Sequence, residues 1–262
     1  MLPPRLTKAW TEIVDLVYPP RCEVCGQDSP EPLCDDCVAA IEYVAPPYCA
    51  RCNVPFPPDQ EDRGLCPSCR QSRSPLVAVR SVGLHVGPLR QAVLRLKFQS
   101  AKRLAPVLAR LMYDRVLEEA DRPGGLAVGE IEALVPAVLH QRRRRWRGFD
   151  QAFLLAQELG DLWRIEVIEA VERTKFTRPQ VELEPHQRRR NLQGAFKPVA
   201  GADLAGRTIA VVDDVFTTGA TLEACARAAR RAGAGIVYGL TVTRAVPSWH
   251  PAAAERFVAA GA

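Results

Sequence analysis

The run from Ile209 to Thr221 limits the possible folds of this chain more than any other stretch. Four apolar residues (209–212) lead directly into two adjacent carboxylates, Asp213 and Asp214, and a short loop of Thr and Gly follows. Residues 222–232 are rich in Ala and have the composition of a helix. This order predicts a buried strand, a tight turn and a helix, with the acidic pair at the carboxyl end of the strand.

The predicted turn has the chemistry of a sugar-phosphate site. A helix amino terminus leaves backbone N–H groups unpaired and carries partial positive charge, so it favours phosphate. The residues expected to hold this phosphate are Thr217, Thr218, Gly219, Ala220 and Thr221. Asp213 and Asp214 would repel phosphate and are better suited to hydroxyl groups one sugar away. The stretch therefore indicates a ribose 5-phosphate ligand.

The same residues resemble the phosphoribosyl pyrophosphate (PRPP) motif of the type I phosphoribosyltransferases almost residue for residue. The resemblance implies that Asp213 and Asp214 are the catalytic pair. An acidic pair after a strand also occurs in P-loop NTPases, but the chain lacks the required G-x-x-x-x-G-K-[ST] loop. A receiver-type phosphoacceptor site would follow the first strand of a short domain, and this pair lies near the end of a long chain.

Cysteine spacing indicates a second kind of site. Eight of the nine cysteines form four C-x-x-C pairs. They are Cys22 with Cys25, Cys34 with Cys37, Cys49 with Cys52, and Cys66 with Cys69. Two pairs supply the four thiolates of a tetrahedral structural zinc site, so two zinc ions are expected. Disulfides would need an oxidising compartment, and a thioredoxin-like site needs one pair, not four. Sequential joining of the pairs is favoured, while interleaving the first with the third and the second with the fourth stays possible.

The composition fits a globular protein that handles anions. Apolar residues form 47% of the 262, and the formal net charge is +5. No apolar stretch of about 18 residues is present, which predicts no membrane insertion. Residues 1–20 lack the apolar core of a secretory signal, so the expected location is cytoplasmic. Basic residues gather in two clusters, at 142–147 and at 188–190.

Alternating strand and helix patterns predict an α/β fold. The fold class is an open, mostly parallel sheet with helices on both faces, preceded by a small zinc-ribbon module. Strands are expected at residues 76–85, 131–135, 167–171, 208–212 and 236–243, and helices at 5–17, 88–98, 102–119, 150–162 and 222–232. The expected division is an amino-terminal helix (1–20), a double zinc ribbon (21–72), a phosphoribosyltransferase domain (76–250) and a carboxy-terminal tail or helix (251–262).

Taken together, the motifs resemble the ComF family, competence-associated phosphoribosyltransferase-like proteins with an amino-terminal zinc ribbon. The likeness is carried by the cysteine module, by Leu96-Lys97-Phe98, by residues 135–151, and by residues 173–180 and 188–196. The resemblance implies PRPP binding and a role in natural transformation, with single-stranded DNA and competence-machinery proteins as partners. The family usually has Asn where this chain has Asp150, which adds a negative charge beside the Arg cluster.

Several cations are candidates for binding pyrophosphate. Arg143 and Arg147 follow the predicted strand 131–135, and one guanidinium group can bind two phosphate oxygens at once. Residues 174–187 resemble the loop that closes over substrate in this superfamily, which adds Arg173, Lys175, Gln180 and Arg188. Magnesium is expected to bind mainly through pyrophosphate and ribose oxygens. The alternatives are an exposed charged loop and, for the Arg run, a solvated or nucleic-acid surface. Lys97 either approaches the same site or extends to solvent.

Two function classes follow. One is a PRPP-dependent glycosyltransferase that releases pyrophosphate and whose acceptor the sequence does not specify. The other is a non-catalytic protein of the competence machinery that senses PRPP or nucleotides and binds single-stranded DNA. The oligomeric state is not specified by the sequence.

Overall fold

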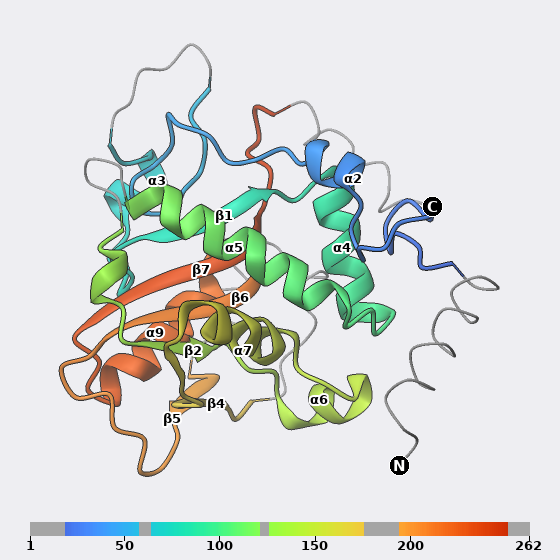
Figure 1. The fold of residues 1–262 in the computed structure, drawn as a ribbon. Helices are drawn as coiled ribbons and strands as arrows, with labels where there is room; N and C mark the ends of the chain where they lie inside the picture. Colours follow the sequence, from blue (N-terminus) through green and yellow to red (C-terminus); the bar gives the residue numbers. More distant parts are fainter. Residues whose placement is uncertain (1–18, 58–63, 121–125, 176–193, 251–262) are drawn as a thin grey trace, which may run out of the picture.

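A computed structural model describes residues 19–57, 64–120, 126–175 and 194–250 (Figure 1). The helix expected at 5–17 and the tail expected at 251–262 lie outside these ranges. Within them, no helix combines the length and the apolar character needed to cross a membrane.

A parallel five-stranded sheet forms the centre of the molecule, in the order β1-β7-β6-β2-β3. Its strands are β1 (Val79–Leu84), β2 (Ala133–Pro136), β3 (Glu166–Val167), β6 (Thr208–Phe216) and β7 (Ile236–Arg244). A second, antiparallel sheet consists of β4 (Val171–Arg173) and β5 (Phe196–Pro198). The open parallel sheet confirms the predicted fold class.

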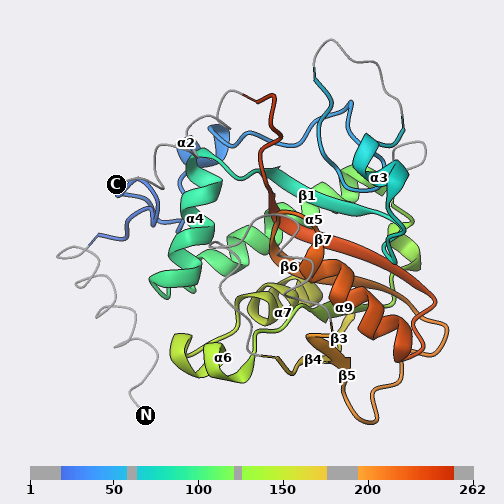
Figure 2. The same ribbon diagram turned by 180° about the vertical axis from the view of Figure 1, so that it is seen from behind.

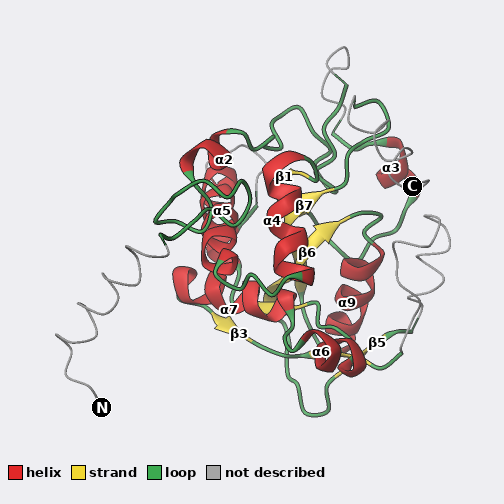
Figure 3. Ribbon diagram, turned by 90° about the vertical axis from the view of Figure 1, so that its right-hand side faces the viewer, coloured by secondary structure: helices red, strands yellow, loops and turns green. Residues whose placement is uncertain are grey.

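Helices cover both faces of the central sheet. Side chains alternate along β6, so Ala210 and Val212 pack on one face while Ile209 and Val211 pack on the other. The first face carries α4 (Gly87–Phe98), α5 (Leu104–Ala120) and α7 (Gln151–Trp163). The second carries α9 (Ala220–Arg231). Figure 3 shows α5 and α7 on one side of the strands and α9 on the other.

The cysteine module is built into this layered core. Segment 42–53 runs along the outer edge of β1, where Val44 N–H donates to Val82 O at 3.0 Å and Asn53 Oδ1 accepts from Ser81 N–H at 2.9 Å. A Cβ at Gly83 would lie 2.6 Å from Glu42 O, so the close approach requires glycine. The module thereby covers a sheet edge that would otherwise expose unpaired backbone groups.

Two expectations about the elements were wrong or incomplete. The single strand expected at 167–171 is two strands in different sheets. The chain turns between them, where Ala170 N–H donates to Ile168 O at 2.8 Å, and an apolar run gives no sign of such a turn. The Arg run, for which no helix was expected, forms α6 (Gln141–Arg147). The remaining short elements are α2 (Asp35–Ala39), α3 (Pro67–Gln71) and a 3-10 turn at Val128–Glu130.

Candidate functional site

The predicted strand, turn and helix form the centre of the candidate site. β6 ends at Phe216, and α9 begins at Ala220 on the face of the sheet that Figure 2 presents. Gly219 caps α9 with φ of 79°, a left-handed conformation. A Cβ on Gly219 would lie 2.8 Å from the ring of Phe216. Both the backbone angle and the close ring therefore require glycine at this turn.

The turn leaves donors available for an anion. In the part of the chain that the structure describes, the backbone N–H groups of Thr218 and Gly219 have no hydrogen-bond partner. They precede the first turn of a 12-residue helix, which adds its own partial positive charge. A small open hollow beside them is lined by Asp213, Phe216, Thr217, Gly219, Ala220 and Thr221, among others. This geometry suits a phosphate group.

The acidic pair is asymmetric. Successive strand residues point to opposite faces, so Asp214 faces α4, where its Oδ1 lies 2.9 Å from Lys97 Nζ. Asp213 Oδ1 accepts a hydrogen bond from the N–H of Asp214 at 2.9 Å and has no ion-pair partner among the described residues. Burial and the charge of Asp214 raise the pKa of Asp213 well above its usual range, although Lys97 opposes this. Asp213 is thus the carboxylate available to a ligand.

The charges of Arg143, Arg147 and Arg173 act on one another or on the acidic pair. The guanidinium carbon of Arg147 lies 5.0 Å from the centre of the Phe98 ring. Burial lowers the pKa of Arg147, while the charge of Asp214 opposes this shift. The guanidinium of Arg173 stacks on Phe196 at 5.5 Å; burial first, and then the charge of Arg143, lower its pKa to about 10. The effect of one charge on the pKa of another falls off with distance, so the three guanidinium groups lie in the same region as the acidic pair.

The predicted closing loop falls mostly outside the described residues. Gln180 and Arg188 lie outside them. Lys175 is exposed, and its Nζ lies 3.4 Å from where a Cβ on Gly194 would be. A contact of these three residues with pyrophosphate therefore stays a prediction.

Asp150 has a structural role that the sequence reasoning missed. It caps α7, its Oδ1 accepting from Ala152 N–H at 3.1 Å and from Phe153 N–H at 3.3 Å. Its Oδ2 accepts from Leu139 N–H at 2.6 Å. All three partners are donors, so a carboxylate suits this position better than an amide would. The signal available in the sequence was an Asp directly before an apolar helical segment.

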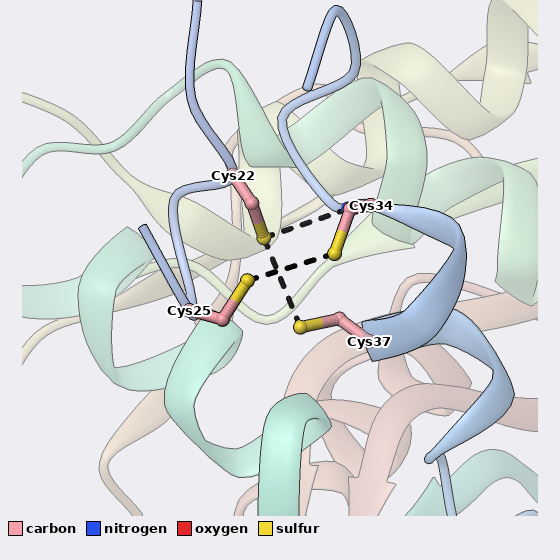
Figure 4. Close-up of side chains that lie close together, drawn as sticks. All are labelled: Cys22, Cys25, Cys34 and Cys37. Atoms are coloured by element: carbon pink, nitrogen blue, oxygen red, sulfur yellow. Dashed lines mark hydrogen bonds between the residues drawn. The ribbon is translucent and has the colours of Figure 1, made fainter. Parts of the chain in front are cut away.

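The cysteines form two separate clusters. Cys22, Cys25, Cys34 and Cys37 converge in one, as Figure 4 shows, and Cys49, Cys52, Cys66 and Cys69 converge in the other. Within each cluster all four sulfurs lie within 4.8 Å of one another. This confirms the sequential joining of the pairs. The clusters lie on opposite faces of the sheet: the first packs with the α4 and α5 side, the second with the α9 side.

The chemistry of both clusters fits structural zinc. All nine cysteines are free thiols. Backbone N–H groups point at sulfur, as at Val24 N to Cys22 Sγ (3.4 Å) and Cys66 N to Cys49 Sγ (3.3 Å). Burial raises the pKa of Cys22, but backbone N–H donors from Cys25 and Cys34 outweigh it and bring the pKa to about 6. Four converging cysteine sulfurs are the donor set of a closed zinc site, so the chain has two such sites.

Comparison with known proteins supports the zinc ribbon and finds relatives along most of the chain. Residues 13–70 match the double zinc ribbon domain family. Competence protein F of Haemophilus influenzae is 34% identical over 205 residues, which cover 77% of this chain and 85% of that protein. DNA utilization protein YhgH of Escherichia coli K12 is 35% identical over 190 residues, covering 72% and 80%. An adenine phosphoribosyltransferase of Mycobacteroides abscessus is 38% identical over 68 residues, covering 26% and 38%.

Proposed function

The chain belongs to the ComF family, the family of competence protein F, and from this premise we propose that it binds PRPP with Mg²⁺ and acts in DNA uptake. The observation that carries the proposal is the meeting of two features at one edge of the sheet. The N–H groups of Thr218 and Gly219, which have no partner among the described residues, lie next to Asp213, the carboxylate that Lys97 leaves available. Phosphate recognition by the turn and hydroxyl recognition by this carboxylate together suit a ribose 5-phosphate.

Each group has a distinct task in the proposed site. Residues 217–221 hold the 5-phosphate, and Asp213 accepts hydrogen bonds from the ribose hydroxyls. Lys97 fixes the orientation of Asp214 through their 2.9 Å ion pair. Arg143, Arg147 and Arg173 bind the pyrophosphate. Mg²⁺ would enter with PRPP and would neutralise part of the pyrophosphate charge.

The reaction in the enzymatic version breaks the bond between C1 of the ribose and a pyrophosphate oxygen, which leaves with the bonding electrons. An acceptor donates an electron pair to C1 and later loses its proton. The cationic groups stabilise the departing negative charge, and the held phosphate and hydroxyls fix C1 relative to the acceptor. Closure of loop 174–187, with Lys175, Gln180 and Arg188, would exclude water from this reactive centre.

Calorimetry with PRPP and Mg²⁺ tests the proposal. We expect one binding site per chain, with ribose 5-phosphate binding more weakly because it lacks the pyrophosphate contacts. A screen of nucleobases for pyrophosphate release then separates the two function classes. Release with one acceptor supports an enzyme, and PRPP binding without release supports the sensor. Absence of PRPP binding would contradict both.

Single-stranded DNA is a second candidate ligand, and α6 is the element that favours it. The helix carries the Arg run, and it also presents Trp146, which is 77% exposed. Proteins that bind single strands combine basic grooves with aromatic rings on which bases stack. The names of the two relatives that match most of the chain, competence protein F and DNA utilization protein YhgH, support a DNA-related role. We also place the protein in the cytoplasm, with competence proteins as partners.

Alanine variants along α6 should separate PRPP binding from DNA binding. Arg143→Ala and Arg147→Ala should weaken PRPP binding most. Arg142→Ala, Arg144→Ala and Arg145→Ala should weaken DNA binding by similar amounts, less so at high salt, because such contacts act through counterion release. Trp146→Ala should weaken DNA binding by roughly 1–3 kcal/mol through lost stacking and leave PRPP binding unchanged.

The measurement is titration of each variant with PRPP and with a labelled oligonucleotide at two salt concentrations. Trp146→Ala is the matched control, since it lies on the same helix. Equal responses of both ligands to all five Arg variants would contradict a pyrophosphate role for this segment.

A further inference from the structure

Arg244 links the second cysteine cluster to the phosphate turn. It is the last residue of β7 and is paired in register with Phe216, the last residue of β6. Its side chain is 8% exposed. One nitrogen, Nη2, donates to Cys52 Sγ at 3.7 Å, and the other, Nη1, donates to the carbonyl of Thr217 at 3.4 Å. The guanidinium therefore contacts a metal ligand at one end and the turn at the other.

The contact with Phe216 extends this link to Gly219. The guanidinium carbon of Arg244 lies 4.5 Å from the centre of the Phe216 ring. That ring is the group closest to Gly219, where an added Cβ would meet it at 2.8 Å. Arg244 thus supports the ring against which the capping glycine of α9 rests.

The contact with Thr217 aims a donor of the phosphate site. In a trans peptide the C=O of one residue and the N–H of the next point in opposite directions. The Thr217–Thr218 bond is trans, because the structure has a cis bond only between two prolines in the ribbon among the residues it describes. By holding the Thr217 carbonyl toward the cysteine cluster, Arg244 turns the N–H of Thr218 away from it. That N–H has no hydrogen-bond partner among the described residues.

The charge of Arg244 needs an anion, and the cysteine cluster is the one at hand. A buried cation is costly unless it is paired. Within the described ranges no carboxylate forms an ion pair with Arg244, and its Nε has no hydrogen-bond partner. Four thiolates around one zinc ion carry net negative charge, whereas four neutral thiols do not. Metal at the second cluster therefore favours the observed position of this side chain.

We propose that Arg244 positions the phosphate turn and, by bridging it to Cys52, couples binding of PRPP at the turn to binding of zinc at the second cluster. The inference rests on the proposed function, since it concerns the same turn. Coupling is reciprocal: zinc at Cys49, Cys52, Cys66 and Cys69 strengthens PRPP binding, and PRPP slows the loss of that zinc. The first cluster lies on the opposite face of the sheet and takes no part.

Zinc release from the wild-type protein into a chromogenic chelator tests the coupling without any substitution at Arg244. PRPP with Mg²⁺ should slow release from the second cluster about fivefold or more and leave the first cluster unaffected. A Cys25→Ser variant, which lacks a ligand of the first cluster, identifies the two phases. Protein that binds PRPP in the calorimeter but releases zinc at an unchanged rate would overturn the coupling and leave the proposed function intact. Protein that binds no PRPP at all would overturn both.

Variants then test whether Arg244 carries the effect. Arg244→Gln should weaken PRPP binding about fivefold or more and abolish the effect of PRPP on zinc release. Arg244→Lys keeps the charge but cannot contact Cys52 and Thr217 at the same time. It should therefore retain zinc better than Arg244→Gln does, while PRPP should still have no effect on its zinc release. Arg51→Gln is the matched control. Arg51 donates to the carbonyls of Cys69 (2.7 Å) and Ser72 (3.0 Å) beside the same cluster without reaching the turn. A folded Arg244→Gln protein in which PRPP still slows zinc release would overturn the proposal.

Discussion

Replacing Cys49 by Ser is expected to unfold much of the molecule and to remove one of two bound zinc ions. Cys49 is fully buried in the core that also contains residues of α9 and of the central sheet. A structural zinc site contributes apparent binding free energy of roughly 10 kcal/mol or more, comparable with the whole stability of a domain. Because this cluster shares its core with the sheet, loss of its zinc should lower the melting temperature of the protein and loosen the face of the sheet that α9 covers.

The first cluster offers the comparison. Cys25 is exposed, so Cys25→Ser should also remove one zinc ion but disturb mainly the segment around that cluster. Cys22 is buried in the core that contains residues of α4 and α5, so Cys22→Ser should disturb this face of the sheet more than Cys25→Ser does. Metal analysis, thermal unfolding and hydrogen exchange measure these effects. Wild-type protein purified without chelator and holding one zinc ion or none would refute the two-site assignment. Equal loss of protection on both faces in Cys25→Ser would refute the difference between the clusters.

Asparagine at both acidic positions is expected to abolish most PRPP binding while the protein stays folded. Asn has nearly the size of Asp but lacks the charge, and each charge-assisted hydrogen bond lost costs roughly 1.5–3 kcal/mol. Each carboxylate should therefore contribute about tenfold to a hundredfold in affinity. The single variants should differ, since Asp213 is available to ligand and Asp214 is bound to Lys97. Calorimetric PRPP binding unchanged in the double variant would rule out this placement of the sugar.

Asp213→Asn should weaken PRPP binding but should make the folded protein more stable. Burial and Asp214 raise the pKa of Asp213 above its ordinary value of 3.8, so the unfolded chain binds fewer protons here than the folded protein. The wild-type protein therefore loses stability from this group as the pH rises from that value through the raised pKa. Asp213→Asn should melt at a higher temperature than wild type near pH 8, and the gain should shrink toward acidic pH. Lys97→Met, which removes the cation that stabilises the pair, should instead lower stability near pH 8.

Much of the candidate site follows from local sequence. The apolar run before Asp213, the glycine at 219 and the helix formers after it act on adjacent backbone, so strand, turn and helix could be predicted together. The two-residue gap of each C-x-x-C pair likewise lets both sulfurs reach one ion. The break between β3 and β4 escaped prediction because residues 167–171 contain no Gly or Pro to indicate a turn, and only the fold shows that the chain changes sheets.

The partners of these local motifs were decided by the tertiary structure. Lys97 reaches Asp214 because α4 packs on the face toward which the even-numbered residues of β6 point. Arg244 contacts Phe216 because β7 lies beside β6 in parallel register. It contacts Cys52 because the zinc ribbon folds against the end of β7. Strand order, register and the face that each segment covers depend on contacts between residues far apart in the chain. A buried charge can find its partner anywhere along such a chain, so periodicity and spacing identify the charged residue without identifying what neutralises it.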